Sequence, residues 1–139
     1  KKIRLELHAE GDPVIQMDKG RIGQVIGNLL ANAIKFTPTA GNVAVILRRA
    51  WGDSVELVVC DSGPGVPVHE LELIFDKFYQ SGRRACHAGG TGLGLAISRE
   101  IIKFHKGHIW AENRPEGGAS FHVRLPIEQP AQAYGEEAA

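Results

Sequence analysis

Residues 89–95 read Gly-Gly-Thr-Gly-Leu-Gly-Leu, and they directly precede a segment with the apolar spacing of a helix. Glycines gathered before a helix expose backbone N–H groups at its positive end, which suits a polyphosphate. Their spacing does not match the glycine fingerprint of dinucleotide-binding folds, and the chain has no Gly-Lys-Ser/Thr phosphate loop. The segment therefore predicts an anion-binding helix start in a fold other than those two.

Two long helices are predicted from the apolar spacing. The first runs from 19 to 36, with Asp18 as its N-cap and Thr37-Pro38 as its stop. The second runs from about 93 to 105 and ends at Lys106-Gly107, where the glycine is expected to stop the helix.

Six short extended runs are predicted as strands, and two pairs of them flank glycine turns at Gly52-Asp53 and at Glu116-Gly117-Gly118. The runs are 3–7, 14–17, 43–47, 55–60, 108–112 and 120–125. A further one or two helical turns are expected within 71–79, and 81–92 is expected to be a mobile loop. Strands interleaved with helices predict a mixed sheet that is covered by helices on one face.

Length and charge limit the possible functions. The 139 residues suit a single domain, here 1–127, followed by a linker or disordered tail at 128–139. Sixteen basic and sixteen acidic side chains cancel, so no broad basic field exists to hold a nucleic acid or an anionic membrane. The two cysteines fit no metal-finger spacing and favour a cytoplasmic location. The chain does not begin with methionine, which suggests a piece of a longer protein with room for a membrane anchor elsewhere.

The first predicted helix carries polar residues at helical spacing. At about 100° per residue, Asn28, Asn32 and Lys35 fall within roughly 60° of one another. Such a stripe can simply face water. Asparagine is a poor residue for a helix interior, however, because its amide competes for backbone hydrogen bonds. Two asparagines one turn apart therefore indicate a functional role. An amide oxygen suits a magnesium ion crowded by phosphate oxygens, and a lysine can reach a phosphate.

Asp61 closes a predicted strand and opens the loop 61–67, which reads Asp-Ser-Gly-Pro-Gly-Val-Pro. The glycines allow this backbone to approach a ligand closely. A carboxylate at this position can accept a hydrogen bond from the exocyclic amine of adenine and would oppose the carbonyl of guanine. The alternative is an aspartate that only caps the turn.

Taken in order, these segments resemble the motif boxes of the catalytic domain of sensor histidine kinases, within the wider ATPase family shared with gyrase, heat-shock chaperones and mismatch-repair proteins. The asparagine box is 28–36, the first glycine box 61–65, the phenylalanine box 75–78, the second glycine box 90–95 and a looser last one 117–121. The gyrase and chaperone branches have a catalytic glutamate where this chain has Asn28, which favours the kinase branch.

The resemblance implies an α/β (α+β) two-layer sandwich: a mixed, mostly antiparallel sheet of about five strands with helices on one face. It also implies that ATP and Mg²⁺ bind, with Asn32 as the metal ligand, Asn28 and Lys35 as catalytic residues and Asp61 as the adenine contact. Further nucleotide contacts are then expected from Phe36, Gly63, Gly65, Val66, Phe78, Gly90, Thr91, Gly92, Leu93, Gly94 and Leu95.

By the same resemblance, the γ-phosphate would pass to a histidine on a dimerisation hairpin that is absent from this chain, and a response regulator would act downstream. Residues 81–90 would form a lid anchored by Phe75 and Phe78. Some members have a phosphate-stabilising arginine where Gln80 stands, and Arg83 and Arg84 are the candidates to substitute for it. The chain on its own is expected to be monomeric.

Two alternatives remain open at this point. One is a degenerate nucleotide sensor that binds ATP and changes its partner contacts without transferring phosphate. The other is a serine protein kinase of the anti-sigma type, which shares the fold. Of the histidines, His69 is expected to be a surface residue rather than a phosphate acceptor, and His105 and His108 are expected to be exposed.

Overall fold

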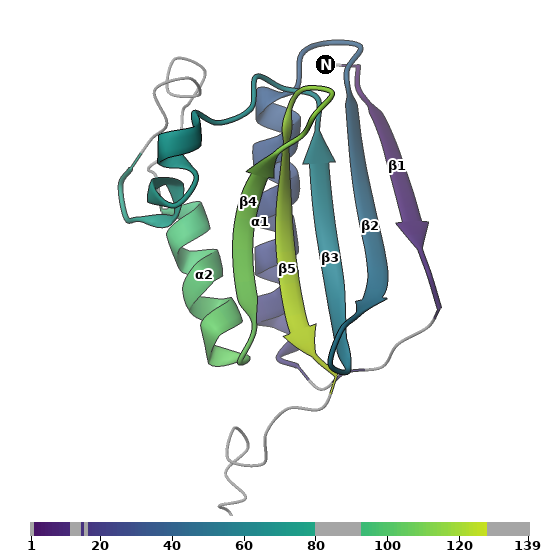
Figure 1. The fold of residues 1–139 in the computed structure, drawn as a ribbon, viewed down its shortest axis with the longest axis vertical. Helices are drawn as coiled ribbons and strands as arrows, with labels where there is room; N and C mark the ends of the chain where they lie inside the picture. Colours follow the sequence, from purple (N-terminus) through teal and green to yellow (C-terminus); the bar gives the residue numbers. More distant parts are fainter. Residues whose placement is uncertain (1, 12–14, 16, 80–92, 128–139) are drawn as a thin grey trace, which may run out of the picture.

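The computed structural model describes residues 2–11, 15, 17–79 and 93–127. In this part of the chain five strands form one sheet in the order β1-β2-β3-β5-β4 (Figure 1). Strand β1 runs parallel to β2, and all other neighbours are antiparallel. The strands are β1 (Arg4–Ala9), β2 (Asn42–Ala50), β3 (Ser54–Asp61), β4 (His108–Asn113) and β5 (Ala119–Pro126). The predicted mixed, mostly antiparallel sheet is confirmed.

Two helices, α1 (Lys19–Phe36) and α2 (Gly94–Phe104), pack on one face of this sheet (Figure 1). The two-layer sandwich is therefore confirmed as well. The sheet-facing side of α1 is apolar, and Val25 and Leu29 on it are almost completely buried. Val43, Val59 and Phe121 form the opposite wall of the core. Removing this apolar area from water is the main stabilising contribution to the packing of the two layers.

The start of α1 follows the sequence prediction. Asp18 has extended backbone angles, and its side-chain oxygen accepts a hydrogen bond from the backbone N–H of Arg21 at 3.1 Å, as an N-cap does. The helix ends at Phe36, directly before Thr37-Pro38.

The residue that reverses the backbone after α2 is not the glycine that was predicted to stop this helix. Lys106, not Gly107, has the left-handed backbone, with φ of 62°. The N–H groups of Lys106 and Gly107 then bond the carbonyls of Lys103 and Ile102, both at 2.9 Å, which is the Schellman arrangement. Gly107 is needed for another reason: a Cβ there would lie 2.3 Å from the carbonyl oxygen of Arg124 on β5.

Both predicted glycine turns are present. Gly52 and Asp53 have positive φ angles of 67° and 54°, and they join β2 to β3. Gly117 and Gly118 have φ of 107° and 86° in the connection between β4 and β5. Glycine adopts this backbone without the steric cost that a Cβ brings.

Three local expectations need correction or lie outside the description. The strand expected at 14–17 is not found at Ile15 or Met17, because this stretch leads directly into the N-cap of α1; Val14 and Gln16 are outside the described residues. Within 71–79 the expected helical turn is a 3₁₀ turn, η2 (Leu73–Phe75), and another 3₁₀ turn, η1 (Val68–Glu70), comes before this range. The predictions for 81–92 and 128–139 also lie outside the described residues.

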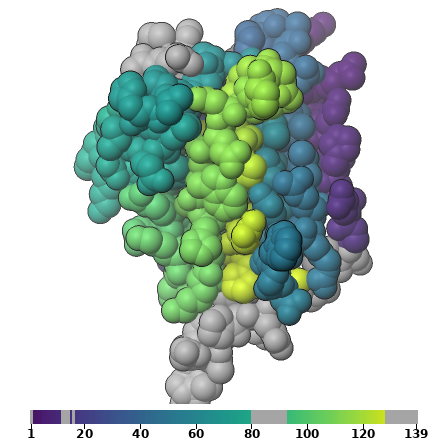
Figure 2. All heavy atoms as spheres, viewed as in Figure 1, coloured from purple at the N-terminus to yellow at the C-terminus, as the bar shows by residue number. Residues whose placement is uncertain are grey.

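The face of the sheet opposite the helices carries a cluster of buried polar side chains. His122 Nδ1 lies 2.9 Å from Glu56 Oε2, and His122 Nε2 lies 3.0 Å from Ser120 Oγ. The imidazole also stacks on Trp110, with ring centroids 4.9 Å apart. In Figure 2 only a narrow yellow strip of β5 is visible between green β4 and the blue strands. The side chains on this face therefore shield β5, although no helix among the described residues covers it.

Candidate functional site

The polar stripe of α1 contacts α2 through Asn28. Asn28 donates hydrogen bonds through Nδ2 to the carbonyl of Gly94 and to Ser98 Oγ, both at 3.2 Å. Asn32 is half-buried one turn later, and Lys35 is exposed near the end of the helix. Asn28 therefore lies at the boundary between the two helices, whereas Lys35 faces solvent.

The start of α2 is where the second glycine box ends. Leu93 is its N-cap residue and makes no side-chain capping hydrogen bond. The first-turn N–H groups of a helix have no partner within the helix, so this end is suited to an anion. Leu95 is half-buried and packs against the core. Gly90, Thr91 and Gly92 lie outside the described residues.

Asp61 is completely buried at the end of β3. Its Oδ1 accepts hydrogen bonds from the backbone N–H of Gly63 at 2.9 Å and of Ala119 at 3.2 Å. Because Val43 is its register partner on β2 and is itself in the core, the side chain lies on the helix-facing side of the sheet. Two backbone donors hold one carboxylate oxygen and so determine how the carboxylate is oriented.

The first glycine loop packs against the end of α1. A Cβ on Gly63 would lie 2.6 Å from the carbonyl oxygen of Phe36, so glycine is required for this approach. Gly65 has φ of 76°, in the left-handed region. Val66 follows it and is fully buried. The loop thus brings Asp61 and Val66 beside the same helix that carries the asparagine stripe.

The two phenylalanines of the phenylalanine box have different environments. Phe75 is buried and packs edge-on against Phe121, with ring centroids 6.4 Å apart. Phe78 is 71% exposed and has φ of 65°, a left-handed conformation that is unusual for a bulky residue. The structure therefore places Phe75 in the core and leaves Phe78 on the surface, next to the undescribed segment. Whether either anchors a lid stays a prediction.

Three further groups have displaced pKa values. Burial raises the pKa of the Cys60 thiol, next to Asp61. The pKa of Tyr79 is raised by burial and then by the nearby Glu70. A hydrogen bond from its own backbone, followed by the guanidinium of Arg114, lowers the pKa of Glu116.

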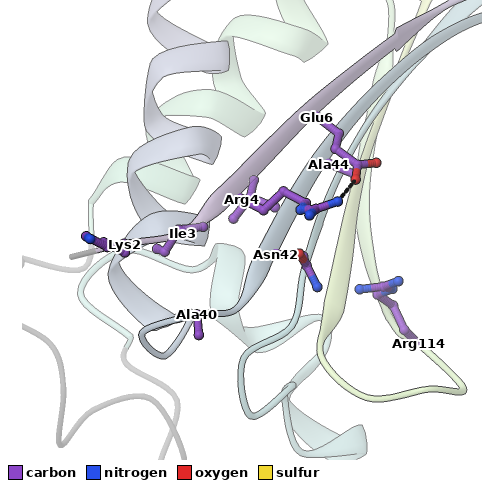
Figure 3. Close-up of a pocket in the computed structure, with 9 residues that line it drawn as sticks. Lys2, Ile3, Arg4, Glu6, Ala40, Asn42, Ala44 and Arg114 are labelled. Atoms are coloured by element: carbon purple, nitrogen blue, oxygen red, sulfur yellow. Dashed lines mark ion pairs between the residues drawn. The ribbon is translucent and has the colours of Figure 1, made fainter.

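An open cavity of about 970 Å³ lies elsewhere, at the β1–β2 end of the sheet (Figure 3). Arg4, Glu6 and Asn42 line it, with Arg114 across from them. None of the residues predicted for nucleotide binding is among its lining. We therefore assign the candidate site to the junction of α1, the 61–67 loop and the start of α2, and not to this cavity.

Sequence reasoning did not find three side chains that hold the site together. Ser98 accepts from Asn28, and Asn113 and Arg114 bond the 61–67 loop across the sheet. Each acts on a residue far away in the sequence, so no local pattern could have indicated it. Within the described residues, no group of three or more His, Cys, Asp or Glu side chains is placed to hold a metal, and no helix is long and apolar enough to cross a membrane.

Comparisons with known proteins agree with this geometry. The model of a family described as histidine kinase-, DNA gyrase B- and HSP90-like ATPase matches residues 17–129. The chain is 41% identical over 115 residues to the adaptive-response sensory kinase SasA of Rippkaea orientalis, covering 83% of this chain but only 29% of that protein. It therefore spans less than a third of this relative.

Solved structures give the same result. The catalytic domain of histidine kinase ThkA is 34% identical, with a TM-score of 0.79, and the match covers 91% of this chain and 81% of that domain. ThkA in complex with response regulator protein TrrA matches with 31% identity and a TM-score of 0.74, over 90% of this chain and 34% of that one.

Proposed function

This chain belongs to the histidine kinase-, DNA gyrase B- and HSP90-like ATPase family, and we propose that it binds Mg-ATP and presents the γ-phosphate to a histidine on another segment of a sensor histidine kinase. One observation carries the proposal. The end of α1 is in contact with the Asp61 loop through Phe36 and Gly63, while Asn28 on the same helix bonds Gly94 at the start of α2. The proposed base-reading carboxylate and the proposed phosphate-binding helix start are thus joined by one helix, α1.

In this proposal the Asp61 carboxylate accepts a hydrogen bond from the exocyclic amine of adenine. Val66 and Leu95 form apolar walls for the base. Phe36, Gly63, Gly65 and Phe78 complete the contacts to the nucleoside. The hydrogen bonds from Gly63 and Ala119 support this role, since they hold the carboxylate in one orientation.

The phosphates are assigned to the other end of the site. Lys35 reaches them as a point charge, and the N–H groups of Gly92, Leu93 and Gly94 and those near Gly90 and Thr91 hold the tail. Asn28 keeps α1 against α2 and supports Asn32. No covalent step falls to these residues, so their contribution is to position ATP, neutralise charge and exclude water.

The donor set fits a magnesium ion that is bound mainly by phosphate. Asn32 supplies a neutral amide oxygen half-buried on α1, which is compatible with an ion that keeps oxygen ligands from its substrate and from water. When bound, Mg²⁺ would offset the negative charge of the phosphate oxygens. Asn32 is the residue we assign to hold it.

The acceptor and the downstream partner are proposed from the relatives. ThkA has been solved with the response regulator TrrA, and we propose a response regulator as the partner of the kinase to which this chain belongs. The acceptor is proposed to be a histidine on a dimerisation hairpin, the chain alone to be a monomer, and the location to be cytoplasmic with an optional membrane anchor elsewhere in the parent.

Calorimetric titration tests the nucleotide part of the proposal. ATP, ADP and GTP are compared with and without Mg²⁺, and we expect adenine-selective binding that Mg²⁺ strengthens. Equal affinity for ATP and GTP, or no binding at all, would contradict it. Incubation of the chain and labelled ATP with a histidine-bearing helical hairpin then tests transfer, which should yield an acid-labile phosphoprotein; an acid-stable product on a serine protein would favour the anti-sigma type instead.

A further inference from the structure

The loop that carries Asp61 is held from across the sheet by two neighbouring residues at the end of β4. Asn113 is the last residue of β4, and Arg114 follows it. Neither belongs to the motif boxes that mark the nucleotide site. Both direct their side chains at the backbone of the 61–67 loop.

Asn113 bonds both polar groups of the Val66 backbone. Its Oδ1 accepts from the N–H of Val66 at 2.8 Å, and its Nδ2 donates to the carbonyl of Val66 at 2.6 Å. The side-chain amide thereby makes the two hydrogen bonds that the backbone of a neighbouring strand would make. Because Val66 is fully buried, neither of these backbone groups could be left without a partner at low cost.

Arg114 holds the other end of the loop. Its Nη1 donates to the backbone carbonyl of Asp61 at 2.8 Å, while Nη2 lies 2.8 Å from Glu116 Oε2. The same carbonyl is packed against Gly118, where a Cβ would lie 1.9 Å from its oxygen. The turn after β4 therefore contacts Asp61 on its backbone side, while Ala119 and Gly63 bond its carboxylate.

We propose that Asn113 and Arg114 are positioning residues for base recognition: Asn113 sets the place of the Val66 wall, and Arg114 sets the place of the Asp61 carboxylate. This rests on the proposed function, in which Asp61 and Val66 contact adenine. Neither positioning residue touches the nucleotide. They act through the loop, and so they affect the base and not the phosphates.

Selectivity between bases separates this role from a purely structural one. A residue that only stabilises the fold lowers the melting temperature without changing the ratio of affinities for two bases. A residue that positions the base contacts changes that ratio, because ADP and GDP carry the same phosphates. Trp110 provides a matched control on the same strand, since it packs on the opposite face against His122.

The experiment is a calorimetric titration of the full chain with Mg-ADP and Mg-GDP at a temperature where each variant is folded. We expect Asn113→Ala and Arg114→Gln each to reduce the ADP-to-GDP affinity ratio by about five- to tenfold, the effect of losing one hydrogen bond that orients a contact. Trp110→Ala should lower the melting temperature and leave the ratio within about twofold.

Each result decides between the two roles. An unchanged ADP-to-GDP affinity ratio in Asn113→Ala and Arg114→Gln would overturn the inference. These residues would then only stabilise the fold. If Asn113→Ala does not fold, Arg114→Gln alone decides, because its side chain is partly exposed and leaves no buried gap. If the unmodified chain itself shows no preference for ADP, the proposed function fails, and that outcome is distinct from failure of the positioning role.

Discussion

The imidazole of His105 accepts a hydrogen bond through Nε2 from the backbone N–H of Asp18 at 2.9 Å, and it thereby joins the end of α2 to the start of α1. Its Nδ1 lies 2.9 Å from the carbonyl oxygen of Ile101, so the ring hydrogen is on Nδ1. The side chain is 3% exposed. The expectation that His105 is a surface residue was therefore wrong, whereas His108 is exposed as expected.

Replacement of this histidine is predicted to destabilise the fold. His105→Ala should lower the free energy of unfolding by about 1.5–3 kcal/mol, because it removes the partner of Asp18 and leaves a small cavity between the helices. Urea denaturation measures the change. His108→Ala is the matched control and should stay within about 0.5 kcal/mol; equal effects of the two would contradict the role given to His105.

The adenine contact is tested by Asp61→Asn. The amide can keep accepting from Gly63 and Ala119, so the fold should be retained, but it presents a donor where adenine also donates. We predict a roughly ten- to hundredfold loss of ATP affinity by calorimetry. Asp53→Asn makes the same chemical change in the β2–β3 turn and should bind ATP like the parent. Unchanged affinity in Asp61→Asn would remove the adenine assignment.

The metal assignment is tested by Asn32→Asp. A carboxylate repels the phosphates when no metal is present and attracts Mg²⁺ when it is, so the strengthening of ATP binding by Mg²⁺ should increase about fivefold or more. ATP titrations with Mg²⁺ and with a chelator measure it. Gln24→Glu adds the same charge on the same helix and controls for long-range effects. An identical response to Mg²⁺ in Asn32→Asp and Gln24→Glu would count against a ligand role.

The end of α2 gives opposite predictions for two adjacent residues. Lys106→Gly should stabilise the protein by about 0.5–1 kcal/mol, because glycine takes the left-handed backbone without a Cβ penalty. Gly107→Ala should destabilise it by about 1–3 kcal/mol, since the new methyl group would meet the backbone of Arg124. Thermal unfolding of the two variants measures both changes. A higher melting temperature for Gly107→Ala than for Lys106→Gly would contradict the left-handed backbone of Lys106.

A pH dependence follows from Cys60. Burial raises the pKa of this thiol, so the folded state binds the proton more tightly than the unfolded state. Its contribution to stability is therefore complete below the pKa of the unfolded thiol, about 8.5–9, and is lost as the pH rises through the folded value. The stability advantage of the parent over Cys60→Ala should shrink between pH 8 and pH 10 in urea denaturation. A constant difference over this range would contradict the shift.

Much of the fold could be predicted because its signals are local. Asp18 and Pro38 bound α1, and the glycines at 52, 117 and 118 mark the hairpin turns, since each acts on its own stretch of backbone. The strand run at 14–17 could not be judged in this way, because four residues give too short a pattern to separate a strand from a connection.

Local sequence features mark the candidate residues of the site, but not the side chains that support them. Asn28 and Asp61 could be found because helix position and a strand end are local features. Other contacts depend on which strands and helices become neighbours. Examples are the hydrogen bonds of Asn28 to α2 and of Asn113 to Val66. The function of Gly107 was misjudged for the same reason, because the atom that it avoids belongs to β5.

The parallel pairing of β1 with β2 has a consequence for the order of folding and opening. The hairpins β2–β3 and β4–β5 close through short turns, whereas β1 reaches β2 only after the chain has passed through the whole of α1, and β3 reaches β5 only after α2 and β4. Of these two long-range pairs, β3 and β5 lie inside the sheet and are mostly buried, whereas β1 is an edge strand whose six residues are all exposed. Its amide hydrogens should therefore exchange with solvent before those of β3 and β5, and loss of β1 would leave the antiparallel hairpins and both helices in place.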